Sequence, residues 1–436
     1  MPNRMAAGNG GRLGIAALVA ILLLGVGLRV GEASSGRAPV YDAGAYAAIA
    51  RNLDEGNGFT VGAQATQPST DYSPGLPLFV AGVYKVTGGV HERLARLVLA
   101  LIGALAPLLA YLLARRLSGV VAGLIAALVV AIYPATIEYT GMLMTEPLAA
   151  TLLVGAILAI LWAGDGGSLW RWVVPGLTLG ALALVRPEYL AIGLLLALLV
   201  FLRQRLHMPW RRALISTAVV VLGIVVVVAP WTIRNAIALD RFVSVSTGGG
   251  QVLYAGTYLP SDGNPEKVGA AVVAEHPELF GPHAAENLRL EQILARLGET
   301  TYPDMEPDQA LSKMGKEQLK DDIEHHTGEY VGFVATKIGR IWSHGPRAIM
   351  RTPVWEALHW VVLGLGLIGL ALLAYLRRWE ALLIGAVFLA VTLVSALLVA
   401  SPRRVLVLIP LLAACAGTAA VWLTAAVRRG RDQSVL

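Results

Sequence analysis

Two carboxylates in this chain each stand where a helix is expected to begin just outside an apolar run. Asp42, in the stretch 41–59, is followed by Tyr46 and Ile49 at helical spacing, which predicts a short amphipathic helix on a membrane surface. Glu146 is followed by Pro147, a residue favoured in the first turn of a helix. A carboxylate in such a place can accept the proton of an attacking hydroxyl group. Both are therefore candidate acid–base residues.

Each carboxylate also has a purely structural interpretation. Asp is a favourable N-cap, worth about 1 kcal/mol, and a negative charge near a helix N-terminus is stabilised by the helix dipole. The functional interpretation is that Glu146 faces Asp42 across an outer cavity. Both interpretations stay open on these residues alone.

Arginines on the same side of the membrane are the second chemical signal. Arg403 and Arg404 lie in a short connection between two late apolar runs, and further arginines lie at positions 93, 96, 186 and 234. Guanidinium groups bind phosphate well, so these residues are candidates for holding a phosphate at the membrane surface. The simpler interpretation is contact with anionic lipid headgroups. Lys85 is a further candidate, with a snorkelling lysine as the alternative.

Other polar motifs give weaker signals. His325 and His326 are adjacent, and adjacent helical residues do not face the same ligand, so no metal site is expected. The run Gly248-Gly249-Gly250 lacks the Lys and Ser/Thr of a phosphate-binding loop and is expected to be a turn. No cofactor is required by these residues, although two carboxylates leave room for a divalent metal.

Composition determines where these residues must be placed. Of the 436 residues, 56% are hydrophobic and 15% are charged, and the mean hydropathy is +0.64. Soluble domains contain about 25% charged residues, so the chain is expected to be a polytopic membrane protein. Its net charge of +6 comes mostly from arginines that flank apolar runs, which indicates topology and not nucleic-acid binding. The single Cys415 excludes an intramolecular disulfide.

Apolar runs of bilayer-crossing length predict about ten spans. They lie near 13–31, 93–113, 118–134, 147–163, 172–185, 188–202, 213–230, 355–376, 381–400 and 405–427. The fifth and sixth meet in a tight re-entry at Arg186-Pro187-Glu188. With this count the flanking arginine clusters fall on one side, which the positive-inside rule makes cytoplasmic together with both termini. We expect a plasma (inner) membrane protein whose candidate site is extracytoplasmic.

Three parts follow from this topology: a membrane core at 1–230, an extracytoplasmic loop or small cap at 231–354, and C-terminal transmembrane helices at 355–436. The first outer loop, 32–92, carries Asp42 and a second surface helix that runs through Val86.

The larger outer segment is expected to be mostly helical. It begins with a β-like run, Phe242 to Thr247, and helices are expected around 284–297, 307–325 and 328–343. The fold class is therefore all-α: a bundle of about ten transmembrane helices with surface helices and a small helical cap.

Taken in order, short motifs along the chain resemble the GT-C superfamily of polyprenyl-phosphate-sugar glycosyltransferases. The nearest branch is the protein-mannosyltransferase and aminoarabinose-transferase-like group, glycosyltransferase family 39. The resemblance runs from about residue 41 to 256 and returns weakly at 401–411. The motifs are Asp42-x-x-x-Tyr46-x-x-x-Ala50, Leu53 with Gly56-x-Gly58-Phe59, Tyr72-Ser73-Pro74-Gly75-x-Pro77-Leu78, Tyr133-Pro134, Thr145-Glu146-Pro147, Arg186-Pro187 and Pro230-Trp231-x-x-Arg234-Asn235.

The resemblance implies roles for individual residues. Asp42 would be the catalytic carboxylate of the first outer loop, Glu146 a second acidic residue, and Arg403 and Arg404 the contacts to the lipid phosphate. Lys85 is a candidate for the same phosphate from its position alone. The candidate substrate-binding residues are Tyr46, Glu138, Tyr139, Arg186, Arg234 and Asn235.

Two departures from the family pattern concern the first outer loop. Aminoarabinose transferases usually carry Lys-Pro-Pro where this chain has Ser73-Pro74-Gly75, and a basic residue where it has Ala45. The contacts to the donor phosphate must therefore differ.

The implied activity is that of an inverting glycosyltransferase. It would move a sugar from a polyprenyl-phosphate donor to an extracytoplasmic acceptor, which would be a lipid, a glycan or a protein. Asp42 would act as general base, typically worth about 10²–10⁴-fold, and arginine would stabilise the leaving phosphate. Donor, acceptor and membrane lipids are the expected partners, and nucleic acid is not.

Two other classes remain as alternatives. A transporter or flippase of a lipid-linked or small anionic solute would place charges mid-span and show paired interrupted spans, whereas the candidate charges here cluster in outer loops. A noncatalytic scaffold that binds a partner through 231–354 would tolerate replacement of Asp42.

Overall fold

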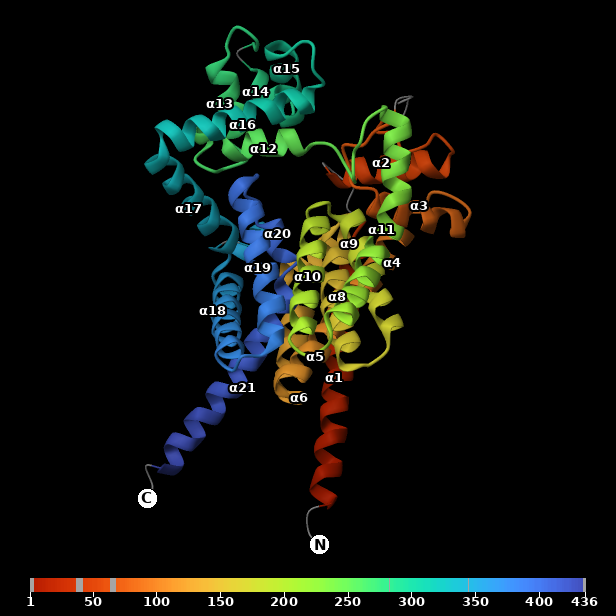
Figure 1. Ribbon diagram of the computed structural model, residues 1–436, viewed down its shortest axis with the longest axis vertical. Helices are drawn as coiled ribbons and strands as arrows, with labels where there is room; N and C mark the ends of the chain where they lie inside the picture. Colours follow the sequence, from red (N-terminus) through yellow and green to blue (C-terminus); the bar gives the residue numbers. More distant parts are fainter. Residues whose placement is uncertain (1–3, 37–41, 63–67, 282, 344, 434–436) are drawn as a thin grey trace. The chain divides into compact units, whose positions relative to one another are not determined.

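The computed structural model describes residues 4–36, 42–62, 68–281, 283–343 and 345–433. Tyr41, which opens the stretch around Asp42, lies outside these ranges. Within them every regular element is a helix, so the predicted all-α class is confirmed (Figure 1). Segments in a bilayer must satisfy their backbone hydrogen bonds internally, which helices do.

Seven helices among the described residues are long and apolar enough to cross a membrane. They are Arg12–Ala33 of α1 (Arg4–Ala33), Glu92–Ser118 comprising α4 (Glu92–Gly103) and α5 (Leu105–Ser118), α8 (Glu146–Asp165), α11 (Trp210–Leu239), α18 (Pro353–Tyr375), α19 (Trp379–Leu397), and Ile409–Arg428 of α21 (Ile409–Gln433).

One further pair of apolar helices among the described residues would make an eighth span if the two helices cross the membrane as one. α6 (Val120–Ile132) and the segment Pro134–Gly141, which begins with α7 (Pro134–Glu138), form a pair bent by 58°. The bend falls at Pro134, which cannot donate the backbone hydrogen bond that would continue α6. α9 (Val173–Val185) is shorter than the seven spans, and α10 (Glu188–Arg205) carries charged residues at both ends. The predicted tight connection lies between these two helices. The total of about ten spans stays a prediction.

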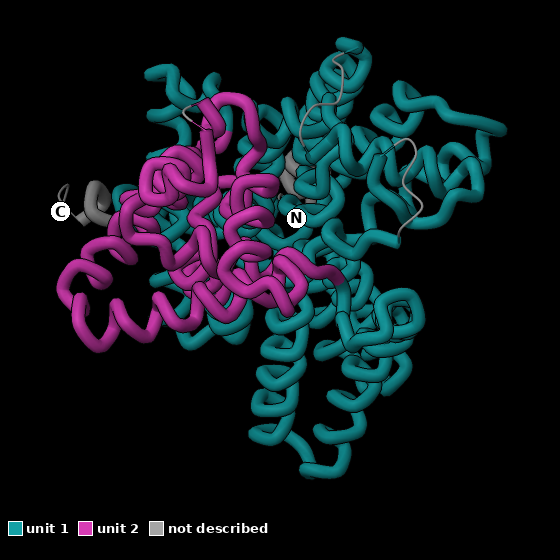
Figure 2. The backbone as a smooth tube through the Cα atoms, turned by 90° about the horizontal axis from the view of Figure 1, so that it is seen from above, with its two compact units in different colours: residues 1–245, 347–388, 406–436 teal, residues 246–346, 389–405 magenta. Residues whose placement is uncertain are grey.

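The chain divides into two compact units (Figure 2). Unit 1 comprises residues 1–245, 347–388 and 406–436, and unit 2 comprises residues 246–346 and 389–405.

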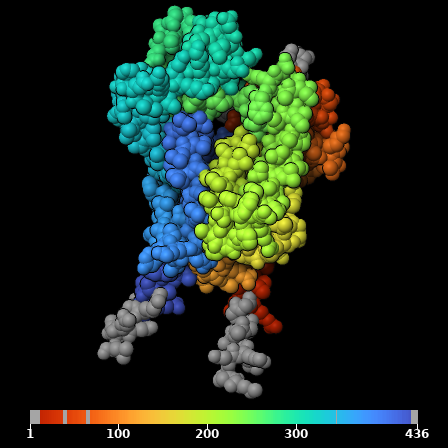
Figure 3. All heavy atoms as spheres, viewed as in Figure 1, coloured from red at the N-terminus to blue at the C-terminus, as the bar shows by residue number. Residues whose placement is uncertain are grey.

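In unit 1, α5, α6 and α21 pack against one another, while α9 packs against α8 and α11. Figure 3 shows α10 and α11 side by side on one face of this unit. At the crossing of α9 and α11 a Cβ on Gly176 would come within 2.5 Å of the Val220 carbonyl oxygen. Gly223 approaches the backbone of Gly176 in the same way. Small residues at a helix crossing let the backbones meet closely in a membrane.

Both predicted surface helices of the first outer loop are present. α2 (Asp42–Asp54) begins at Asp42, as expected, and α3 (Gly75–Thr87) follows the Pro-Gly turn. Ile49 of α2 is buried in a cluster with Phe59 and Trp231, and the two aromatic rings meet edge to face at 4.7 Å. This apolar cluster attaches α2 to α11.

The prediction of a β-like run from Phe242 to Thr247 is wrong, because these residues form no strand in the structure. Its carbonyl groups accept hydrogen bonds from side chains of α11 instead: Val245 from Trp231, and Ser244 from Thr232 at 2.7 Å. A strand forms only where a neighbouring strand can pair with its backbone. Here side chains of α11 donate hydrogen bonds to the backbone carbonyl groups instead.

Unit 2 is helical, as predicted for the outer loop. The expected helix at 284–297 is divided into α14 (Ala284–Asn287) and α15 (Leu290–Thr301), and the two later helices are α16 (Pro307–His325) and α17 (Thr327–Ser343). α12 (Gly249–Thr257) and α13 (Val268–Glu275) also belong to this unit, as do residues 389–405. Its apolar core includes Tyr254, Val272, Leu294 and Leu311.

A lysine is enclosed in unit 2. Lys337 of α17 is 1% exposed, and its Nζ donates to the carbonyl oxygens of Gly256 at 2.5 Å and Ala396 at 2.6 Å. Burial, with a smaller effect of the nearby Arg404, lowers the pKa of Lys337 to about 7. This group is therefore poised to change charge near neutral pH.

Candidate active site

Glu146 and Arg186 form a buried ion pair at the start of two helices. The Glu146 side chain is 2% exposed, and its Oε1 lies 3.6 Å from Nη1 of Arg186. Arg186 also donates from Nε to Oε1 of Glu188 at 2.9 Å. α8 begins at Glu146 and α10 at Glu188, so each carboxylate lies at the positive end of a helix dipole. One guanidinium thus holds two helix starts together.

A small cavity of about 20 Å³ lies beside Glu146, with room for about one water molecule. Its polar lining consists of Arg29, Thr136, Tyr139 and Glu146, and the remaining lining is largely apolar. The structure thus brings two predicted site residues, Glu146 and Tyr139, to one enclosed space.

Arg29 is a residue that the sequence reasoning missed. It lies in α1, is 1% exposed, and donates to the carbonyl oxygens of Val130 at 2.8 Å and Ala131 at 3.0 Å, and to Oγ1 of Thr136 at 3.0 Å. These carbonyls belong to the last turn of α6, where the break before Pro134 leaves them without helical partners. The signal was a single arginine within the first apolar run, and such residues usually have a function.

Glu138 and Tyr139 share a second arginine that sequence reasoning did not identify. Nε of Arg347 donates to Oε2 of Glu138 at 3.0 Å, and its guanidinium lies 6.0 Å from the Tyr139 ring centroid. Close by in the chain, the hydroxyl of Tyr133 lies 2.8 Å from Nδ1 of His359, and both side chains are buried. These contacts attach the α7 segment to α18 and the turn before it.

The first outer loop is fixed to the connection that carries Arg186. Asp42 is partly buried, and Tyr46, one turn later, meets Tyr72 edge to face at 5.4 Å. Oγ of Ser73 donates to the Val185 carbonyl oxygen at 2.8 Å. Val185 directly precedes Arg186. The loop that bears Asp42 is therefore attached, through Ser73, to the residue that precedes Arg186 in the chain.

Gly75 explains part of the departure from the family pattern. A Cβ at this position would come within 2.7 Å of the backbone nitrogen of Val185. The sequence Ser73-Pro74-Gly75 thus provides a hydrogen bond to Val185 and a close approach to its backbone.

Arg234 and Asn235 make structural contacts. Arg234 donates to the carbonyl oxygens of Ser69 at 3.0 Å and Phe59 at 3.3 Å, which holds the first outer loop. Asn235 is fully buried, and its amide donates to the carbonyl oxygens of Val243 and Val245, both at 3.1 Å. Their expected contact with substrate stays a prediction, and these bonds give both residues a positioning role.

The predicted phosphate ligands lie in separate elements. Arg403 and Arg404 form the start of α20 (Arg403–Leu406), where Arg404 donates to the Val399 carbonyl oxygen. Lys85 is exposed in the last turn of α3. Phosphate binding by these three residues stays a prediction.

No group of three or more His, Cys, Asp or Glu side chains is arranged to hold a metal ion in the part of the chain that the structure describes. His325 and His326 contact different carboxylates: Oδ1 of Asp321 at 3.0 Å and Oε2 of Glu329 at 3.7 Å.

The chain is similar to a known protein family and to solved structures. Residues 71–233 match the family model for dolichyl-phosphate-mannose-protein mannosyltransferase. This segment contains Ser73, Gly75, Glu146 and Arg186. No curated protein sequence matches the chain significantly.

Two solved structures from Archaeoglobus fulgidus share the fold. The oligosaccharyltransferase in the apo form is 16% identical, with a TM-score of 0.55 over 97% of this chain and 52% of that one. The oligosaccharyltransferase AglB in complex with an inhibitory peptide and a dolichol-phosphate is 18% identical, with a TM-score of 0.56 over the same shares, 97% and 52%. The chain thus spans about half the length of these neighbours.

The expected resemblance is confirmed by these matches. The chain is a multi-pass membrane protein that shares the fold of these archaeal oligosaccharyltransferases, and its residues 71–233 match the family model for dolichyl-phosphate-mannose-protein mannosyltransferase.

Proposed function

We propose that this protein is an inverting glycosyltransferase that moves a sugar from a polyprenyl-phosphate donor to an acceptor outside the cytoplasm. The observation that carries the proposal is the attachment of the Asp42 loop, through Ser73 and Val185, to the buried Glu146–Arg186 pair within the matched segment. The archaeal neighbour whose structure is a complex with an inhibitory peptide and a dolichol-phosphate supports a lipid-phosphate donor.

Asp42 and Glu146 have different surroundings, and we therefore assign them different roles. Glu146 is buried and already paired with Arg186, so it serves to hold that arginine. Asp42 is partly exposed at the first residue of α2, where an acceptor hydroxyl can approach it. Asp42 is therefore the general base and Glu146 the positioning residue.

The reaction is a single displacement. The acceptor oxygen forms a bond to the anomeric carbon while the bond from that carbon to the donor phosphate oxygen breaks. The hydroxyl proton passes to Asp42, and the bonding electrons leave with the phosphate. Arg403 and Arg404 are the residues we assign to this growing negative charge, because guanidinium groups stabilise it electrostatically. Attack from the opposite side inverts the sugar carbon.

We place both termini in the cytoplasm of a plasma (inner) membrane and the reaction on its outer face. The basis is the arginine distribution, since the positive-inside rule assigns arginine-rich ends to the cytoplasm. Labelling of single cysteines introduced at Ser34 and Arg205 in a Cys415→Ala background, with an impermeant thiol reagent on intact cells, tests this orientation. Labelling is expected at position 34 and not at position 205.

The enzymatic test uses the full chain in nanodiscs with a panel of radiolabelled polyprenyl-phosphate sugars. Wild type is compared with Asp42→Asn and with Asp54→Asn, the same change at the other end of α2. Asn still caps a helix. Asp42→Asn should lower turnover by about 10²-fold or more, whereas Asp54→Asn should leave it within about twofold. Equal turnover by wild type and Asp42→Asn would refute Asp42 as the base.

A further inference from the structure

A second cavity of unit 1 lies at the opposite end of α8 from Glu146, where that helix ends at Asp165. It has a volume of about 420 Å³ and is lined by the ends of α5, α8 and α10 and by the connection from α18 to α19. None of the residues proposed for glycosyl transfer lines it. It is therefore separate from the candidate active site.

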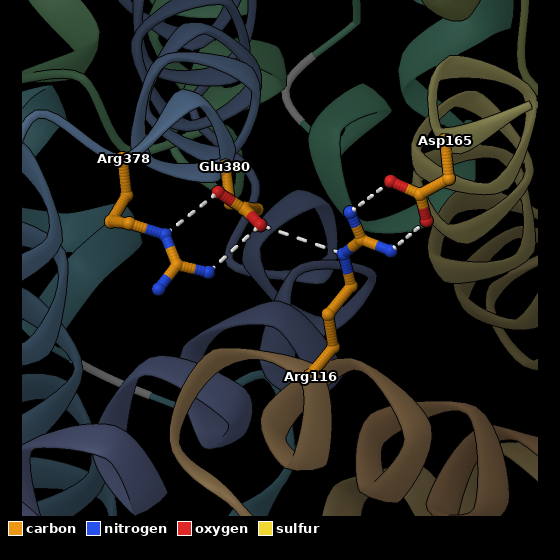
Figure 4. A network of polar contacts seen from close by, with 4 residues as sticks. All are labelled: Arg116, Asp165, Arg378 and Glu380. Atoms are coloured by element: carbon orange, nitrogen blue, oxygen red, sulfur yellow. Dashed lines mark hydrogen bonds and ion pairs between the residues drawn. The ribbon is translucent and has the colours of Figure 1, made fainter.

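Four residues that line this cavity form an ion-pair network (Figure 4). Arg116 of α5 binds both oxygens of Asp165, with Nη2 donating to Oδ1 at 2.8 Å, and its Nε lies 3.5 Å from Oε1 of Glu380. Arg378 donates to the same Glu380 carboxylate, from Nε at 3.3 Å and from Nη2 at 3.1 Å. Two arginines thus neutralise the two carboxylates of the cavity.

Two more arginines leave the cavity positively charged. Arg203 and Arg377 line it, and within the described ranges neither lies in an ion pair. The Arg203 guanidinium lies 5.8 Å from the centroid of the Trp379 ring. Arg377 adopts a left-handed backbone conformation with φ of 54°, which is unfavourable for a residue with a side chain. The lining therefore carries two positive charges that its carboxylates do not balance.

A buried amide in the same wall needs a partner. Gln204 is 6% exposed and lines the cavity, and neither its Nε2 nor its Oε1 has a hydrogen-bond partner in the protein. A buried amide without partners is costly, so a site that contains one favours a ligand able to pair with it. The amide nitrogen therefore lacks an acceptor, and the amide oxygen lacks a donor.

We propose that this cavity binds a phosphate ester that also carries a hydroxyl group. The phosphate lies against Arg203 and Arg377, because guanidinium groups bind phosphate through paired charged hydrogen bonds. With the Gln204 side chain turned toward the cavity, its Nε2 donates to a phosphate oxygen and its Oε1 accepts from the hydroxyl. This chemistry is shared by glycerol-bearing phospholipid headgroups and by soluble phosphate esters. Basic pockets between transmembrane helices are known to take anionic headgroups.

The test measures thermal stabilisation of the detergent-solubilised full chain by three probes. They are dihexanoyl phosphatidylglycerol, glycerol 3-phosphate and, as a zwitterionic comparison, dihexanoyl phosphatidylcholine. Ligands that bind the native state raise the melting temperature with concentration. Phosphatidylglycerol alone raising it identifies a lipid headgroup, and an equal rise with glycerol 3-phosphate identifies a soluble ester. No rise with either anionic probe, or an equal rise with phosphatidylcholine, would overturn the proposal.

Matched variants locate the site. Arg203→Gln should raise the apparent Kd for the stabilising probe at least tenfold, whereas Arg205→Gln, the same charge change two residues along α10 and outside the cavity lining, should leave it within twofold. Equal effects of the two variants would show a non-specific charge effect and overturn the proposal.

Gln204→Leu separates ligand binding from folding. Because the variant removes an unpaired buried amide at similar volume, its melting temperature without probe should equal or exceed that of wild type. Its stabilisation by the probe should fall at least fivefold. A lower melting temperature without probe, together with unchanged stabilisation by it, would refute the role assigned to the amide.

Discussion

Removing Arg186 should lower the free energy of unfolding far more than removing an arginine from an exposed ion pair whose charged atoms lie closer together. The two atoms of the buried pair are 3.6 Å apart, with side chains 13% and 2% exposed. The atoms of the Arg51–Glu92 pair are 3.2 Å apart, with side chains 50% and 25% exposed. Distance alone would make the exposed pair stronger, and burial predicts the reverse.

The magnitudes follow from the surroundings. At an effective dielectric constant of 20, opposite unit charges at the buried separation attract by about 4–5 kcal/mol, and breaking a buried pair on one side costs about 3–5 kcal/mol. Arg186→Gln leaves Glu146 and Glu188 at one site without their cation. We therefore expect a loss of about 3–5 kcal/mol in the free energy of unfolding. Arg51→Gln should cost less than about 1 kcal/mol, as exposed pairs do.

The assay is reversible unfolding of the detergent-solubilised protein, followed by helical circular dichroism. The double variant Glu146→Gln with Arg186→Gln completes the cycle, and its loss should be smaller than the sum of the two single losses by about 0.5–3 kcal/mol. Losses that are additive within error, or equal losses for Arg186→Gln and Arg51→Gln, would refute the assignment of Arg186 as a buried link between helix starts.

Three further changes test other parts of the structure. Gly75→Ala should displace the first outer loop, since its Cβ would meet the Val185 nitrogen at 2.7 Å; transferase turnover should fall at least tenfold, with Gly82→Ala, where a Cβ meets nothing within 4 Å, as the control. Arg29→Met leaves the α6 carbonyls unpaired and should lower the free energy of unfolding by about 1–3 kcal/mol, measured as above. Lys337 should make stability rise with pH: unfolded lysine keeps its proton up to its usual pKa of 10.5 and the folded side chain only to about 7, so between these values the unfolded state binds more protons. The slope of the free energy of unfolding should be at most about 1.4 kcal/mol per pH unit, and a slope unchanged in Lys337→Met would contradict the assignment.

Local sequence signals predicted the helices that carry the candidate site. Glu146 before Pro147, and Asp42 with Tyr46 one turn later, are short-range patterns, and both helices begin where these patterns place them. The tight connection at Arg186 was predictable for the same reason.

Residues that act over long distances in the chain were not predictable in this way. Arg29 lies in an otherwise apolar run, so averaged hydropathy conceals it, and its carbonyl partners on α6 are more than one hundred positions away. Arg347 pairs with Glu138 across 209 positions, and no local pattern specifies that contact. The strand predicted from Phe242 does not form, because the partner of this run, α11, is a helix.

The discontinuous composition of unit 2 has a consequence for biosynthesis. Residues 246–346 are made before residues 389–405, yet Lys337 is held by the carbonyl oxygen of Ala396, and Gly256 lies against the backbone of Leu398. During synthesis Lys337 therefore stays hydrated and charged until residues 389–405 have been made. A chain arrested before residue 389 should leave this unit open to protease, and one that extends past residue 405 should not.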